Sequence, residues 1–196
     1  KVVLDPFNLM LNIKTVGSKF KNQNEIISIE SIRTQISLKS YFEKKFSIKN
    51  LEISTKSLKI KNLISFFRSF QNTPELFILE KSVKGGYLIA DIKLEFDEKG
   101  KVKDNYIISG FLKDIKLDVF KKYNFQKLDS IFEYQKDNLS LNNIKFSFND
   151  LNFLSENILF KKVQNSFLVS GNINHKVLDI KEKNLNFFLK PYLPEI

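Results

Sequence analysis

Residues 87–96 have the sequence Tyr-Leu-Ile-Ala-Asp-Ile-Lys-Leu-Glu-Phe, and this stretch decides the fold class. Apolar side chains occupy every second position from 88 to 96, and charged side chains occupy positions 91, 93 and 95. Successive side chains of a β-strand point to opposite faces of the sheet. The stretch therefore predicts a strand in a sheet with one apolar face and one face in contact with water.

The same alternation recurs along the chain, and five times two polar residues interrupt it between two apolar-x-apolar pairs. One extra residue in a strand turns the later apolar side chains to the wrong face unless a β-bulge or a two-residue hairpin turn absorbs it. Both geometries keep the apolar residues together, and we favour bulges because alternation continues through residues 27–38. The polar dipeptides are Glu30-Ser31, Lys49-Asn50, Lys113-Asp114, Asn142-Asn143 and Asn149-Asp150.

A helical insertion is predicted at about residues 62–83. Within it, residues 63–70 place Leu and Phe at i, i+3, i+4 and i+7, the spacing of one helix face. A second short helix is predicted to follow, because Thr73 suits an N-cap and Pro74 suits the first helical position. A closing apolar cluster at 184–190 is expected to be helical or irregular. Further strands are predicted at residues 106–112, 115–119, 128–134, 139–148, 151–160 and 167–173.

Length and composition limit what kind of protein this is. No linker divides the 196 residues, and the first residue is Lys1. We interpret residues 1–196 as a single β-rich segment of a larger protein. Cysteine is absent, which excludes disulfides and thiolate chemistry. Because no run of eighteen apolar residues occurs, we expect no membrane-spanning helix in this part of the protein.

No motif in the sequence indicates an enzyme. His175 is the only histidine, and no second histidine or nucleophile accompanies it. Gly85-Gly86 lacks the sequence context of a phosphate-binding loop. We therefore expect no catalytic residues, no metal site and no cofactor.

The net charge of +10 raises the question of nucleic-acid binding. Arg33 and Arg68 are the only arginines among 32 basic residues, although arginine is the usual reader of bases. The phenylalanines occupy the same alternating positions as Ile and Leu, where core residues are found. We expect no nucleic-acid partner.

An apolar sheet face has to be covered by a second sheet, by helices or by a ligand. The predicted helices are few, so a long, curved, mostly antiparallel sheet could remain an open groove. A closed β-sandwich core is the alternative that the pattern leaves open. If the groove is open, the candidate lining residues are Leu88, Ala90, Ile92, Leu94, Ile108, Leu112, Leu139, Leu141, Phe146 and Phe148.

Residues 26–53 resemble the AsmA-like family of bacterial envelope proteins. There, two alternating stretches flank a short connector and lead into Ile48-x-x-Leu51-x-Ile53, which a further apolar pair, Leu58 and Ile60, follows. Similar features recur in residues 86–119 and 167–173. The resemblance covers about two thirds of the chain.

The resemblance implies an elongated β-rich groove with an apolar interior. It also implies a periplasmic protein, anchored in the inner membrane by an N-terminal helix outside this sequence, that holds or conducts phospholipid acyl chains and supports outer-membrane lipid homeostasis. The alternative is a non-enzymatic structural or interaction domain with a closed core.

Overall fold

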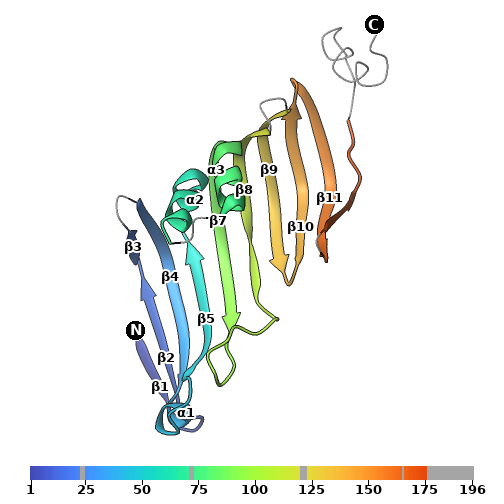
Figure 1. The fold of residues 1–196 in the computed structure, drawn as a ribbon. Coiled ribbons are helices and arrows are strands. Elements are labelled where there is room, and N and C mark those ends of the chain that lie inside the picture. The colour runs from blue at the N-terminus through green and yellow to red at the C-terminus, as the bar shows by residue number, and fades with distance from the viewer. Residues whose placement is uncertain (23–24, 71–72, 120–122, 165, 176–196) are drawn as a thin grey trace, which may run out of the picture.

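The chain folds, in a computed structural model, into one long sheet with three short helices. The structure describes residues 1–22, 25–70, 73–119, 123–164 and 166–175, and the predicted cluster at 184–190 lies outside them. Figure 1 shows the sheet from the side that carries α2 and α3. The helices are α1 Leu38–Phe42, α2 Ile60–Arg68 and α3 Pro74–Ser82. The strands are β1 Val2–Asp5, β2 Met10–Val16, β3 Lys19–Asn22, β4 Glu25–Ser37, β5 Ile48–Thr55, β6 Leu58–Lys59, β7 Val83–Glu95, β8 Ile107–Val119, β9 Tyr123–Gln135, β10 Asn138–Phe148, β11 Leu151–Val163 and β12 Ser166–Gly171.

All strand pairs in the described residues are antiparallel. The order across the sheet is β1-β2-β4-β5-β7-β8-β9-β10-β11-β12, while β3 pairs with β4 and β6 pairs with β7. The first and last strands of this path do not pair with each other, so the sheet is open. The mainly β, antiparallel prediction is confirmed.

Four of the five polar dipeptides lie inside strands. The pairing register shifts between Ile29 and Ser31 in β4, and a second shift in the β4–β5 pairing lies beside Lys49-Asn50 of β5. A third register shift lies in β8 between Leu112 and Ile115, around Lys113-Asp114. The fourth shift, in β10, follows Asn142. These dipeptides are β-bulges, which return the next apolar side chain to the same face.

The fifth dipeptide, Asn149-Asp150, is a hairpin turn between β10 and β11. Both residues have positive φ, 50° and 65°, as a two-residue type I′ turn requires. The preference for bulges is therefore wrong at this position.

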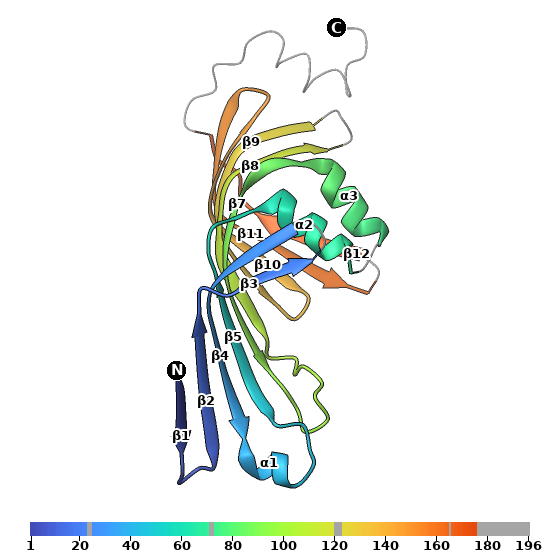
Figure 2. The same cartoon turned by 90° about the vertical axis from the view of Figure 1, so that its left-hand side faces the viewer.

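The bulges of neighbouring strands lie close together and bend the sheet. Gly86 of β7 approaches the backbone of Asp114 and Ile115 in β8. The backbone N–H of Asp114 donates in turn to Asp129 Oδ1 of β9, and Asp129 is the register partner of Lys145 in β10. Bulges increase the local bend and twist of a strand. Figure 2 shows the upper part of the sheet curving toward the side that carries α2 and α3, which makes that side concave.

The helical insertion is confirmed as α2 and α3, which pack in the concavity. Helix α2 lies on β4, β6 and β7, and α3 lies on β7 and β8. Ile64 of α2 is buried, and Leu63 and Phe66 pack against the buried cluster of Ile27, Ile29 and Leu58. Thr73 caps α3 as predicted, since its hydroxyl accepts from the N–H of Leu76.

Three details differ from the sequence-based expectation. The stretches at 106–112 and 115–119 form one strand, β8, because the bulge at Asp114 does not end the pairing. The polar connector after β4 contains a one-turn helix, α1, capped by Ser37. The short strands β1 and β3 were not predicted as strands, since neither has a long alternating stretch.

The tight contact of Gly110 in β8 with the backbone of β7 allows a test of this strand pair. A Cβ on Gly110 would lie 1.9 Å from the Ile89 carbonyl oxygen, whereas a Cβ on Gly85 would meet nothing within 4 Å. We expect Gly110→Ala to lower the free energy of unfolding by about 3 kcal/mol. Gly85→Ala, on the adjacent strand, should change it by about 0.5 kcal/mol or less. Urea unfolding of both variants checks this, and equal midpoints would contradict it.

Candidate functional site: the concave face of the sheet

A row of apolar side chains crosses the concave face at right angles to the strands. Each member is the register partner of the next, from β4 to β12. Seven spacings of about 4.8 Å give the row a length of ~34 Å. The members are Ile32, Ile53, Ile92, Ile108, Tyr134, Leu139, Phe160 and Val169.

The structure brings the predicted lining residues together on this face. Leu88 pairs with Leu112 and Ile92 pairs with Ile108. Leu139 and Leu141 of β10 join the same surface through their partners on β9. Ala90 is buried, and the other nine predicted residues are half-buried.

Phe146 and Phe148 belong to an aromatic cluster beyond the bulge of β10. The ring of Phe148 lies 4.8 Å from that of Phe125, and the ring of Phe146 stacks on that of Phe153 at 5.3 Å. Tyr123 stacks on Phe148 at 6.3 Å. The predicted set therefore divides into an aliphatic part on one side of the bend and an aromatic part on the other.

Sequence reasoning missed several residues that complete this face. Phe132 and Tyr134 of β9 connect the β8 candidates to the β10 candidates. Ile144, which follows the β10 bulge, is 2% exposed. The alternation of residues 128–134 was the signal that could have identified the first two.

A depression of about 500 Å³ lies at one end of the face, between β9, β10 and β11. Tyr134, Leu139 and Phe160 line it together with Asp137 and Lys162. Its volume is within the usual range of small-molecule sites. The depression therefore combines an apolar surface with two charged side chains.

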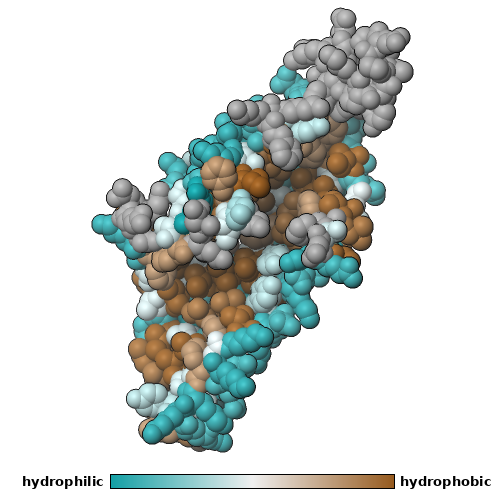
Figure 3. All heavy atoms as spheres, in the orientation of Figure 1, coloured by the Kyte–Doolittle hydropathy of each residue, from teal (hydrophilic) through white to brown (hydrophobic). Residues whose placement is uncertain are grey.

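The helices cover only part of this face. In the same view as Figure 1, Figure 3 shows hydrophobic residues gathered beside and below α2 and α3, with hydrophilic residues along the margins. Arg68 of α2 forms an ion pair with Glu80 of α3, which ties the two helices together. Most of the row of register partners lies on strands other than those that carry these helices.

The opposite face is mainly polar. Asn50 Nδ2 donates to Gln35 Oε1 at 2.7 Å, and Arg33 lies 3.9 Å from Glu52 across the same two strands. The expected water-facing side of residues 91–95 is exposed as predicted.

This polar face nevertheless carries a small apolar patch that the alternation did not indicate. The strand-crossing partners Ile89, Phe111 and Ile131 are 44%, 56% and 37% exposed, and Tyr87 lies beside them.

The described residues contain no group of three or more metal-ligating side chains. None of their helices has the length and apolar character needed to cross a bilayer. His175, expected on a surface loop, lies half-buried with its ring edge-on to Phe153 at 5.3 Å.

Comparisons with protein-family models, curated proteins and solved structures found no significant match.

Tyr134, which lines the depression, changes the pKa of its neighbour Tyr106. The hydrogen bond that the Tyr106 hydroxyl donates to Tyr134, together with burial, raises the pKa of Tyr106 from 10.0 to about 12. A raised tyrosine pKa favours the neutral form, so this contribution to stability is complete below pH 10 and is lost as the pH rises toward 12.

We expect Tyr134→Phe to return the pKa of Tyr106 toward its ordinary value. Ultraviolet titration of tyrosinate measures this, since one late-titrating group should disappear. Tyr41→Phe, which removes an exposed tyrosine far from this pair, should leave the late step in place. A late step that survives Tyr134→Phe would contradict the assignment.

Proposed function

We propose that the concave face holds or conducts the acyl chains of phospholipids. The row of apolar register partners is the observation that supports this proposal most strongly. The hydrocarbon core of a bilayer is about 30 Å thick, so one acyl chain extends ~15 Å. The row is about twice that length, and each CH₂ group that it removes from water contributes about 0.8 kcal/mol.

The incomplete burial of the apolar side chains in the row supports the same proposal. In a closed core, side chains such as Ile92, Ile108 and Leu139 would be fully buried by a second layer. Here they are half-buried, and no second sheet faces them in the described part of the chain. Ligand binding would remove this remaining apolar area from water.

The depression at β9–β11 offers a place for the polar end of a lipid. Lys162 and Asp137 line it beside the apolar surface of Leu139 and Phe160. A phosphate near the Lys162 ammonium group would keep contact with water while the acyl chains lie along the row. Under this proposal, phospholipid is the ligand and the protein performs no chemistry on it.

The resemblance of residues 26–53 to the AsmA-like family gives the proposal its cellular setting. The chain would be a segment of a periplasmic protein anchored in the inner membrane by a helix outside this sequence. Its groove would contribute to lipid transport and to outer-membrane lipid homeostasis. An open antiparallel sheet with a concave side is compatible with this setting.

A pair of substitutions on the same strand tests the proposal. Ile92→Glu places a charge in the row on the concave face, and Ile89→Glu places the same charge on the opposite face, where Ile89 is 44% exposed. We expect Ile92→Glu to reduce loading with a fluorescent phospholipid about tenfold or more, because an acyl chain cannot solvate a carboxylate. Ile89→Glu should load like the parent chain.

Direct extraction completes this test. Organic extraction of the purified chain followed by mass spectrometry should recover phospholipid. A lipid-free, monodisperse and cooperatively folding chain would count against the proposal. So would an Ile92→Glu chain that unfolds outright, because that result belongs to a closed core.

A lipid-free chain, or an Ile92→Glu chain that unfolds, would favour the second candidate function, a structural or interaction domain. The patch of Ile89, Phe111 and Ile131 is the observation that favours it, because exposed apolar patches on soluble domains often contact other proteins.

A further inference from the structure

Three strongly exposed aromatic side chains, two of them the most exposed in the described part of the chain, lie at one end of the molecule. We define the α1 tip as residues 6–9, 38–45 and 97–103. Phe7 is 96% exposed, Phe42 is 75% exposed and Tyr41 is 66% exposed, and Leu9 beside them is 47% exposed. Single exposed apolar residues are ordinary, but here four lie on two segments that a backbone hydrogen bond joins.

Hydrogen bonds fix the backbone that carries Phe7 and Leu9. Asp5 Oδ1 accepts from the backbone N–H groups of Phe7 and Asn8 at 3.1 and 3.2 Å, which fixes the turn that presents Phe7. The N–H of Leu38 donates to the carbonyl of Leu9 at 2.8 Å and joins this turn to α1. The exposure of Phe7 is therefore built into the fold.

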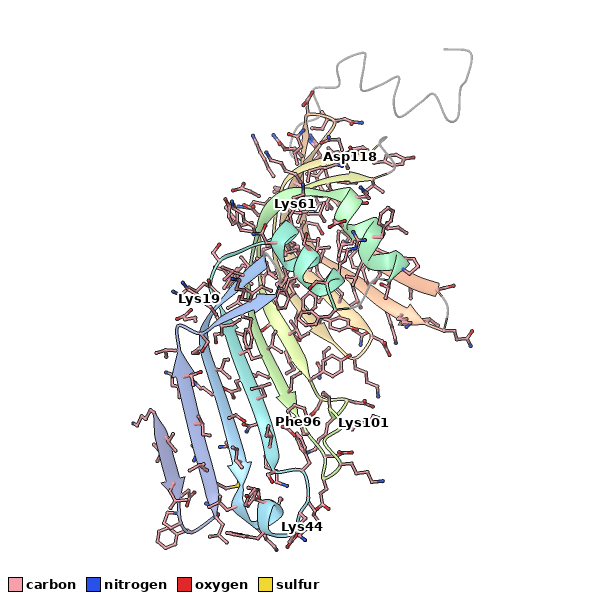
Figure 4. All side chains as sticks on the ribbon, turned by 60° about the vertical axis from the view of Figure 1, so that its left-hand side comes forward. Lys19, Lys44, Lys61, Phe96, Lys101 and Asp118 are labelled. Atoms are coloured by element: carbon pink, nitrogen blue, oxygen red, sulfur yellow. The ribbon has the colours of Figure 1, made fainter. Side chains whose placement is uncertain are left out.

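The third segment of the tip is attached in the same way. The N–H of Phe46 donates to the carbonyl of Glu98 at 3.2 Å, and the ring of Phe46 lies 5.4 Å from that of Phe96. Figure 4 shows Lys44 at the extreme end of the molecule and Lys101 on the β7–β8 loop above it.

At the tip, acidic side chains are paired while two lysines have no ion-pair partner among the described residues. Lys45 lies 3.2 Å from Glu43 and 3.1 Å from Glu98, so one cation faces both carboxylates. Asp97 accepts backbone N–H groups within its own turn. Lys39 and Lys44 make no ion pair with any residue that the structure describes.

We propose that the α1 tip docks on the surface of a bilayer that contains anionic phospholipid. Aromatic and apolar side chains on a protruding tip can enter the boundary between headgroups and acyl chains. Lysines beside them are attracted by the negative surface potential. The tip lies at the ends of the strands, so this contact is separate from the concave face, and it does not depend on the proposed function.

A fluorescent reporter tests the proposal directly, because the chain contains no tryptophan. Phe7→Trp places a single indole at the tip and keeps its aromatic character. Phe111→Trp places one on the opposite sheet face, away from the tip, where the native ring is 56% exposed. The probes are vesicles of phosphatidylcholine alone and of phosphatidylcholine mixed with phosphatidylglycerol.

We expect the emission of Phe7→Trp to shift to shorter wavelength on addition of the anionic vesicles at low salt. The shift should weaken at high salt and with neutral vesicles, because charge attraction contributes. Phe111→Trp should show no shift. An unchanged emission of Phe7→Trp, or an equal shift in Phe111→Trp, would overturn the proposal.

Co-sedimentation with the same vesicles provides a second measurement. Phe7→Ser combined with Phe42→Ser should reduce the bound fraction at least about tenfold, since two rings no longer leave water. Lys39→Glu combined with Lys44→Glu should reduce it on anionic vesicles only. If the parent chain does not bind vesicles but self-associates through Phe7 and Phe42, the tip contacts a second copy and the proposal fails. Ile92→Glu should bind vesicles like the parent chain. This outcome would distinguish vesicle docking by the tip from acyl-chain loading on the concave face.

Discussion

The two-residue repeat of side-chain direction in a β-strand is the constraint on which the rest of the structure depends. Any strand that gains one residue must bulge or lose its apolar face. Strands β4, β5, β7, β8 and β10 all gain residues. The bulges near Gly86 of β7, Asp114 of β8 and Asn142 of β10 lie close together. The concavity that shelters α2 and α3 is the combined effect of these local corrections.

Most of the fold was predictable because long alternating stretches are strong signals. Two similar dipeptides, one within β10 and one directly after it, show the limit of prediction from alternation. Asn142-Asn143 and Asn149-Asp150 both reach positive φ, yet the first continues a strand and the second reverses it. The outcome depends on the neighbouring strand β9, whose own irregularity at Lys127 accommodates the bulge, and local sequence does not contain that information.

The sequence predicted which residues of the candidate site share one side of the sheet, but not how much of that side stays exposed. Alternation predicted that the ten candidate residues share one face, and the register joins those of β8 to those of β10 through Phe132 and Tyr134. The degree of cover depends on where α2 and α3 pack, which is a tertiary property. For the same reason, the exposed patch around Phe111 could not be distinguished from core by its residue type.

The order of the strands also bears on how the molecule assembles. From β7 to β12 every strand pairs with its immediate neighbours in sequence, and the turns at residues 136–137 and 149–150 contain only two residues each. Closing such short loops costs little chain entropy, so this half can form hairpin by hairpin. Its cooperativity should resemble that of a repeat protein, in which each unit is stabilised by the units beside it.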